Sequence, residues 1–242
     1  MVTIAVTREP AEEPRVAVSP ETVKKLSAAG ATVRVESGAG LRSRFSDEAL
    51  KTAGAEIVSH EAALNGADIL LAVRRPSPDD VKALKPGALV IAGLNPYDDR
   101  AGLDALAATG ASVFAMEFMP RTTRAQSMDI LSSQANLAGY KAVVDAGAMF
   151  GQALPMMMTP AGTVPAAKAF IMGVGVAGLQ AIATARRLGA QVTATDVRPA
   201  TKEQVQSLGA KFIAVEDEEF KQAQTAAGYA KPMSAEYQAK QA

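Results

Sequence analysis

Strand-like and helix-like segments alternate along the first half of the chain, separated by short polar turns. Apolar or alternating positions predict strands over Thr3–Val6, Thr32–Glu36, Ile69–Val73, Ala88–Ala92 and Ser112–Ala115. Helix-like segments lie between them at about 20–29, 47–53, 60–65, 78–83 and 99–108. Strands that alternate with helices of this length are typical of a parallel sheet. We therefore predict an open α/β domain over residues 1–123.

The pattern changes between residues 124 and 165. Arg124–Phe150 resembles one long helix, and four of its apolar residues recur at helical spacing, which predicts a buried stripe: Met128, Leu131, Ala135 and Ala138. Three prolines then interrupt the chain around a run of methionines, Met156–Met158. We expect this region to connect two domains, with the methionines filling gaps in the core between them.

A second α/β unit is predicted over residues 166–215, and it contains the most specific motif of the chain. Gly173, Gly175 and Gly178 form G-x-G-x-x-G, here called the glycine fingerprint. A strand-like run precedes it, a helix-like segment starts near Val176, and the next strand-like run ends at Asp196. This order is typical of a dinucleotide site. With strands only near 169–172, 191–195 and 211–213, we expect the second Rossmann-like domain to be incomplete.

Each residue type in the fingerprint has a physical role. The first glycine permits the tight turn, the second lets the backbone approach a pyrophosphate, and the third lets helix and strand pack closely. The helix that starts near Val176 presents N–H groups to the phosphates, and Val174 is a further expected contact of the cofactor. Asp196 is expected to accept hydrogen bonds from the adenosine ribose, which favours NAD(H). Arg198 follows Asp196 and Val197, and an arginine at this place can hold a 2′-phosphate, so NADP(H) remains an alternative cofactor. A glycine-rich turn without a nucleotide is the alternative.

Composition narrows the functional classes. The 242 residues include 25 Lys+Arg, 25 Asp+Glu and no cysteine, so disulfides and thiolate chemistry are excluded. A net charge of zero gives no overall field that would attract nucleic acid, and we expect neither a nucleic-acid partner nor a metal. The most apolar stretch, Ala169–Ala185, is shorter than a bilayer span and belongs to the nucleotide motif. The final segment, 216–242, is polar and alanine-rich, and we expect a mobile loop, a lid or a tail.

A polar cluster precedes the fingerprint at Arg121–Gln134. Gln126, Asp129 and Ser132 are spaced i, i+3, i+6, which places them along one side of a helix. Short polar residues weaken a helix, so they favour a role in contacts. The functional interpretation puts them and Arg121 in a cleft that holds an amide-bearing ring. The alternative is a solvated helix start with Ser127 as its N-cap.

The chain has few groups that fit a proton-transfer role. A dehydrogenase that acts on a carbonyl needs a placed acid or base. The single histidine, His60, follows a helix-starting serine and is expected to be an exposed first-turn residue, and no Tyr-x-x-x-Lys pair occurs. Hydride transfer between two nicotinamide rings needs only close approach, orientation and exclusion of water. The composition fits that reaction better than carbonyl reduction.

These motifs together resemble a known family. Several stretches are similar to the NAD(H)-binding domain I, the first part of the alpha subunit, of proton-translocating nicotinamide nucleotide transhydrogenases. These stretches are RVAVSPETVKKL with ESGAG, MPRTTRAQSMDILSSQANLAGYKAVVDA, the long block from PMMMTPAGTV to SLGAKF, and GYAK. The resemblance implies two Rossmann-like domains joined by a long helix. It also implies a homodimer, peripheral on the cytoplasmic side of the membrane, that passes hydride from NADH to NADP⁺ on a beta subunit. Membrane subunits, including the membrane part of alpha, would couple this transfer to proton translocation.

The resemblance also assigns site residues. The dihydronicotinamide would be positioned by Arg121, Gln126, Asp129 and Ser132, with Ser127 and Met128 as further cofactor contacts. Gly228 and Tyr229, in GYAK, would belong to a loop that closes over the nucleotide. Family members continue past residue 242, so we expect a C-terminally truncated form.

Related alanine dehydrogenases share the opening motif and define the main alternative, a soluble alanine-dehydrogenase-like enzyme. Their catalytic lysine and histidine would fall near Arg74 and Asn95, so both are replaced here, whereas the carboxylate-binding arginine is retained as Arg15. A non-catalytic NAD-binding fragment is a further alternative.

Overall fold

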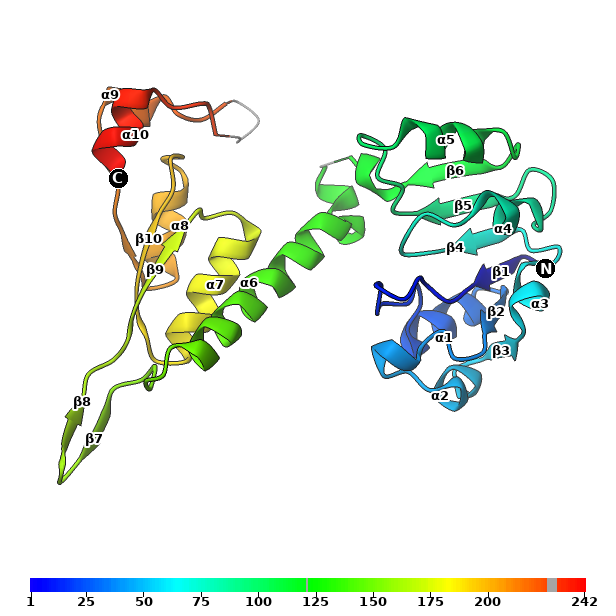
Figure 1. Cartoon of the computed structure of the whole chain (residues 1–242), viewed down its shortest axis with the longest axis horizontal. Coiled ribbons are helices and arrows are strands. Elements are labelled where there is room, and N and C mark those ends of the chain that lie inside the picture. The colour runs from blue at the N-terminus through cyan, green and yellow to red at the C-terminus, as the bar shows by residue number, and fades with distance from the viewer. Residues whose placement is uncertain (121, 226–229) are drawn as a thin grey trace. The chain divides into compact units, whose positions relative to one another are not determined.

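The computed structural model describes residues 1–120, 122–225 and 230–242, and it divides into two compact units, Met1–Asp129 and Ile130–Ala242. Each unit contains its own parallel sheet (Figure 1). The predicted fold class, α/β with Rossmann-like parallel sheets, is confirmed, with six strands in the first sheet and three in the second.

The first unit has a six-stranded sheet with the order β3-β2-β1-β4-β5-β6, and all neighbouring strands are parallel. The strands are β1 (Thr3–Val6), β2 (Thr32–Glu36), β3 (Ala55–Val58), β4 (Ile69–Leu71), β5 (Leu89–Ala92) and β6 (Ser112–Ala115). Five lie within the predicted ranges, and β3 was not predicted. The chain order reverses between β1 and β4, which is the place where open α/β sheets form a crevice.

Five helices connect these strands, and each begins where the sequence offers a capping side chain. They are α1 (Pro20–Ala28), α2 (Asp47–Thr52), α3 (His60–Leu64), α4 (Pro78–Lys82) and α5 (Arg100–Ala107). The side chains that cap them, each accepting a backbone N–H three residues on, are Ser19, Ser46, Ser59, Ser77 and Asp99. These caps satisfy N–H groups that the first turn leaves free, so they fix the helix starts.

Two apolar cores cover the two faces of this sheet. One contains Val6 and Val35 with residues of α1 and α2, such as Val23. The other contains Ala5 and Leu70 with residues of α3, α4 and α5. Because successive residues of a strand point to opposite faces, the neighbours Ala5 and Val6 of β1 contribute to different cores.

The predicted helix over Arg124–Phe150 is wrong at its start. Thr123–Met128 form a short 3₁₀ helix, Asp129 is extended, and the α-helix α6 covers Ile130–Met149. Gln126 and Asp129 therefore do not share a helix side. The predicted buried stripe is also wrong for the chain by itself, since Met128 and Leu131 are 48% and 60% exposed. The helical spacing predicted a helix correctly but could not show what covers it.

The prediction that the methionines are buried gap-fillers is wrong as well. The strands β7 (Met157–Thr159) and β8 (Gly162–Val164) form an antiparallel hairpin. Met156, Met157 and Met158 are all at least half exposed. A two-stranded hairpin has little surface in which to bury side chains, so its apolar residues face outward.

The second unit is built around a three-stranded parallel sheet with the order β11-β10-β9. Its elements are β9 (Lys168–Met172), α7 (Val176–Arg187), β10 (Gln191–Thr195), α8 (Thr201–Ser207) and β11 (Lys211–Phe212). Ile182 of α7 and Val205 of α8 pack on Val192 and Ala194 of β10 in one core. The helix α6 lies against α7 in this unit (Figure 1).

The last segment forms two short helices, α9 (Glu218–Lys221) and α10 (Ala235–Gln241). Tyr237 of α10 is buried and donates its hydroxyl hydrogen to the carbonyl oxygen of Val215 at 3.0 Å. Residues Gly228 and Tyr229 lie outside the described residues, so the mobility proposed for this segment stays a prediction. Among the described helices, none combines the length and apolar character that crossing a bilayer requires.

Candidate nucleotide-binding site

The glycine fingerprint forms the turn between β9 and α7. Gly173 has a φ of +90°, which side chains rarely adopt, and its N–H donates to the carbonyl oxygen of Thr195 at 2.9 Å. A Cβ on Gly178 would lie 1.9 Å from the carbonyl oxygen of Gly173. Only glycine at both positions allows the strand to turn and the helix to start directly against it.

Gly175 differs from Gly178 in its open surroundings and from Gly173 in its backbone conformation. Apart from its chain neighbours, a Cβ there would have no atom within 4 Å, and its φ of −81° is open to any residue. Gly175 is also the N-cap of α7 and supplies no capping side chain, so the N–H groups of the first turn have no partner within the helix. Free N–H groups at the positive end of a twelve-residue helix, beside an uncovered backbone, fit a pyrophosphate.

Asp196 directly follows β10 and links the fingerprint loop to the turn that comes after it. Its Oδ2 accepts the N–H of Val174 at 2.7 Å, and its Oδ1 accepts the N–H of Arg198 at 2.8 Å. The Arg198 guanidinium donates to both carboxylate oxygens, from Nε at 2.9 Å and from an Nη at 2.8 Å. Burial alone would raise the pKa of the Asp196 carboxyl, but the hydrogen bonds from Arg198 and Val174 hold it below its usual value. The carboxyl is therefore ionised at neutral pH.

A close contact between α6 and α7, not predicted from the sequence, supports the helix start. Gly139 is the buried glycine of α6, and a Cβ there would lie 2.0 Å from the carbonyl oxygen of Ala177. One turn earlier in α6, Asn136 donates from Nδ2 to Oε1 of Gln180 at 3.1 Å. A glycine inside a helical pattern often marks such a contact, and that was the available signal.

The predicted polar cluster divides between the two units. Gln126, Ser127 and Met128 are exposed in the 3₁₀ helix of the first unit, and Asp129 is half-buried at its end. Ser132 is half-buried in the first turn of α6, in the second unit. Arg121 lies outside the described residues. The shared cleft proposed for these residues and the fingerprint stays a prediction.

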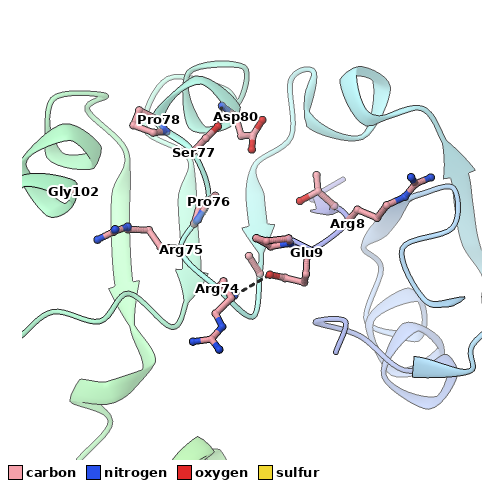
Figure 2. A pocket seen from close by; sticks show the side chains of 12 residues that line it. Arg8, Glu9, Arg74, Arg75, Pro76, Ser77, Pro78, Asp80 and Gly102 are labelled. Carbon is pink, nitrogen blue, oxygen red and sulfur yellow. Dashed lines mark hydrogen bonds between the residues drawn. The ribbon is translucent and has the colours of Figure 1, made fainter. Parts of the chain in front are cut away.

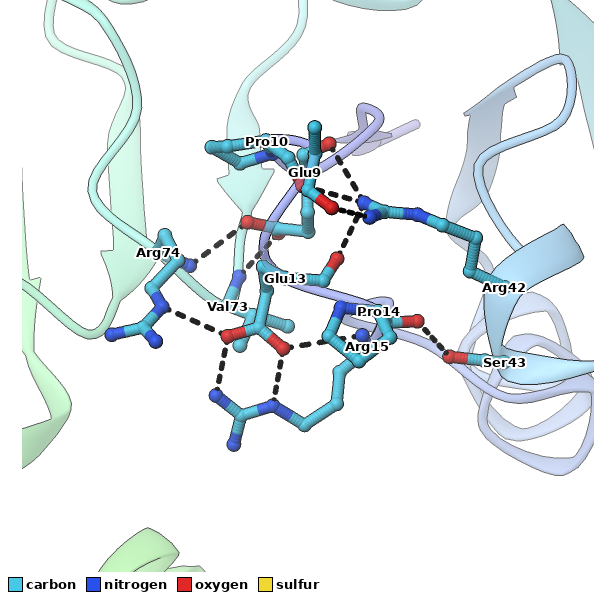
Figure 3. A network of polar contacts seen from close by, with 10 residues as sticks. Glu9, Pro10, Glu13, Pro14, Arg15, Arg42, Ser43, Val73 and Arg74 are labelled. Atoms are coloured by element: carbon cyan, nitrogen blue, oxygen red, sulfur yellow. Dashed lines mark hydrogen bonds and ion pairs between the residues drawn. The ribbon is translucent and has the colours of Figure 1, made fainter.

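A second polar cluster lies in the first unit, where the loops after β1 and β4 meet (Figure 3). Glu13 is buried and accepts hydrogen bonds from Arg15 at 2.6 Å and from Nε of Arg74 at 2.8 Å. The bond from Arg15 is the main reason that the pKa of Glu13 falls to about 2. Glu9 accepts the N–H groups of Val73 and Arg74, and its burial raises the pKa of its carboxyl.

A cavity of about 530 Å³ lies beside this cluster, between the same two loops (Figure 2). Its lining includes Arg8, Glu9, Arg74, Arg75, Ser77 and Asp80. Asn95, near which the family resemblance places the alanine dehydrogenase histidine, has a φ of +50° and donates its backbone N–H to Glu117 at 2.8 Å. The guanidinium groups of this cluster are permanently protonated and cannot serve as general bases.

His60 is a half-exposed bridge between two carboxylates. Its Nδ1 lies 2.9 Å from Glu36 and its Nε2 lies 3.0 Å from Asp80. A neutral imidazole can donate from only one ring nitrogen, so this arrangement favours the protonated ring. The hydrogen bond to Glu36 is the largest cause of a raised pKa for His60. The residue is at a helix start as predicted, with an ion-pairing role that the sequence did not indicate.

The fold and the fingerprint geometry define an α/β protein with a dinucleotide-type strand–turn–helix site in its second unit. Comparison with known proteins agrees with this class. Residues 5–138 match the family described as alanine dehydrogenase/PNT, N-terminal domain, and residues 142–236 match alanine dehydrogenase/PNT, C-terminal domain. The chain belongs to this family, and the predicted relationship is confirmed.

Individual relatives make the comparison more specific. The first part of the NAD(P) transhydrogenase alpha subunit from Rhodospirillum rubrum is 56% identical over 97% of this chain. The Rickettsia prowazekii protein of the same name is 46% identical over 100% of this chain. The chain spans 62% and 64% of the length of these relatives.

Solved structures show the same fold. The crystal structure of transhydrogenase from Sinorhizobium meliloti is 59% identical, with a TM-score of 0.83 over 88% of this chain and 64% of that one. An L-alanine dehydrogenase is 26% identical, with a TM-score of 0.76 over 89% of this chain and 61% of that one.

Proposed function

We propose that this chain binds NAD(H) at the glycine fingerprint and passes hydride from NADH to NADP⁺ held by a partner subunit. The single observation that carries the proposal is the open Gly175 at an uncapped helix start, in a chain similar to transhydrogenase alpha subunits. A nicotinamide cofactor supplies the hydride when bound, and the residues of this chain bind and orient it.

The fingerprint residues divide the binding work. Gly173 and Gly178 shape the turn, and Gly175 and Val176 bring backbone N–H groups to the pyrophosphate, while Val174 lies beside it with its N–H held by Asp196. Asp196 holds the adenosine ribose, with Val197 and Arg198 beside it. Because the Asp196 carboxyl is ionised, it repels a 2′-phosphate, which favours NAD(H) over NADP(H) at this site.

The polar cluster positions the dihydronicotinamide ring. Gln126 and Asp129 carry groups that pair with a carboxamide, and Arg121 and Ser132 complete the set. The exposure of Gln126 leaves its amide accessible to a ligand. The task of these residues is orientation, because hydride transfer between two rings moves no proton at the rings.

An alanine-dehydrogenase-like activity is the alternative function. The second polar cluster, which lies in the first unit around Glu13 and Arg74, argues against it. The resemblance places the lysine and the histidine of that reaction near Arg74 and Asn95, and an arginine or asparagine side chain does not act as a general base at neutral pH. NADH oxidation that depends on pyruvate and ammonia would establish the alternative instead.

The proposed assembly is a homodimer on the cytoplasmic face of the membrane, held there by the NADP(H)-binding beta subunit and the membrane part of alpha. Exposed apolar side chains support an assembly. They include Leu131, Leu137, Tyr140 and Met149 on α6 and Met157, Met158 and Val164 on the hairpin. Surfaces of this kind are typical of protein contacts.

Hydride transfer to the partner tests the proposal. The chain is mixed with an isolated NADP(H)-binding beta-subunit domain, NADP⁺ and NADH that carries deuterium at C4, and the label is followed into NADPH. We expect transfer that requires both proteins. Asp129→Asn should leave NADH binding measurable but slow the transfer, and an unchanged rate would remove the role assigned to Asp129.

A further inference from the structure

The Asp196 carboxylate is fully occupied within the chain. It accepts four hydrogen bonds, two from backbone N–H groups and two from the Arg198 guanidinium. A carboxylate offers about four acceptor positions, so none is left for a ligand. The Asp196 side chain is 7% exposed, which agrees with this account.

The two kinds of donor differ in how easily they leave. The N–H groups of Val174 and Arg198 belong to the fold and cannot move away without unfolding the turn. The Arg198 guanidinium ends a long side chain that is 24% exposed, and besides Asp196 it contacts the carbonyl oxygen of Val174, at 3.1 Å. It can therefore rotate toward solvent while the turn stays intact.

An adenosine ribose bound through Asp196 needs two acceptor positions for its two hydroxyl groups. Those positions are the ones that the guanidinium fills. We propose that Arg198 is a latch on the ribose subsite, which competes with the cofactor for Asp196 and must open before the ribose binds. This inference rests on the proposed function, because it needs NAD(H) at the fingerprint.

The latch has a measurable cost in affinity. When only a fraction of the protein is in the open form, the apparent dissociation constant is the intrinsic constant divided by that fraction. A partly exposed ion pair is worth up to about 1 kcal/mol, and a bidentate one somewhat more. Removing the guanidinium should therefore tighten binding about 3- to 10-fold. An arginine that contacts the bound cofactor favourably would instead weaken binding when removed.

Three variants test the latch by NADH titration. Arg198→Met keeps the length of the side chain without the donors, Arg198→Lys offers a single charged donor group, and Arg187→Met removes an exposed arginine of α7 as a control. We expect Arg198→Met to tighten the binding of NADH and of ADP-ribose, Arg198→Lys to give a smaller effect, and Arg187→Met to change nothing. Thermal unfolding checks that each variant folds.

A truncated ligand and a double variant make the test specific. Reduced nicotinamide mononucleotide lacks the adenosine ribose, so its affinity should not change in Arg198→Met. In an Asp196→Asn background the guanidinium loses its charged partner, so Arg198→Met should give little further tightening. The difference between the two backgrounds measures the coupling.

The outcomes separate the latch from the proposed function. Unchanged or weaker NADH binding by Arg198→Met contradicts the latch, and so does equal tightening of the mononucleotide. If the unmodified chain binds neither NADH nor ADP-ribose, the proposed function itself fails.

Discussion

Two alanine substitutions at neighbouring glycines of the fingerprint should separate nucleotide binding from folding. Gly175→Ala adds a methyl group where no atom lies within 4 Å and where φ is −81°, so the fold should tolerate it and gain about 0.4–1 kcal/mol from a stiffer unfolded chain. The same methyl group would stand between the pyrophosphate and the helix start. Losing one charge-assisted hydrogen bond costs about 1.5–3 kcal/mol, which raises the NADH dissociation constant about 10- to 150-fold.

Gly178→Ala is the matched contrast. Its Cβ would lie 1.9 Å from a backbone oxygen, so strand and helix must separate by roughly 1 Å, at a cost of about 1–3 kcal/mol or more. Circular dichroism follows unfolding, and NADH fluorescence follows binding in a chain without tryptophan. Gly178→Ala should lose stability as well as affinity. An unchanged NADH dissociation constant in Gly175→Ala would refute the placement of the pyrophosphate at this helix start.

Single contacts elsewhere in the chain give three further predictions. Asp196→Ala should weaken NADH binding by about 1–3 kcal/mol, measured by titration, because it removes the ribose acceptor and the anchor of the Val174 N–H; equal affinity would remove that role. Gly139→Ala should destabilise the second unit by about 2–3 kcal/mol, measured by urea unfolding, because its Cβ would meet a backbone oxygen at 2.0 Å. Gly147→Ala is the control and should not destabilise this unit, because its Cβ would meet only the side chain of Leu154, at 3.1 Å. Protonated His60 has a raised pKa, so its ion pairs should stabilise the fold fully below about pH 6.5 and lose this contribution as the pH rises through the raised pKa. Because the ring is 40% exposed, we expect the free energy of unfolding to change by no more than about 1 kcal/mol over this range, and His60→Gln should lack the change.

Local signals predicted most of the fold. The alternation of apolar and polar segments located the five helices and five of the six strands in the first sheet. The missed strand, β3, has four residues, pairs with one neighbour and opens with Ala55 and Glu56, which have low strand propensity. The hairpin β7–β8 was missed because proline and methionine are not typical strand formers, and its pairing depends on a turn.

The site prediction lacked the contacts that side chains make with one another and with residues distant in the sequence. The motif identified Asp196 and Arg198 as neighbours of the cofactor, but a sequence does not show that one side chain occupies the acceptors of the other. Gly139 and Ala177 meet only because α6 packs on α7, and their separation in sequence hides this. The exposed face of α6 illustrates the same limit, since periodicity shows an apolar residue without showing what covers it.

Calorimetry of this chain with NADH tests the central claim most directly. We predict saturable binding of one NADH per chain, with NADPH bound more weakly, and loss of affinity in Gly175→Ala. The absence of any binding heat with NADH in a folded sample, together with an unchanged NADH fluorescence spectrum, would contradict the assignment of the fingerprint as a nicotinamide nucleotide site.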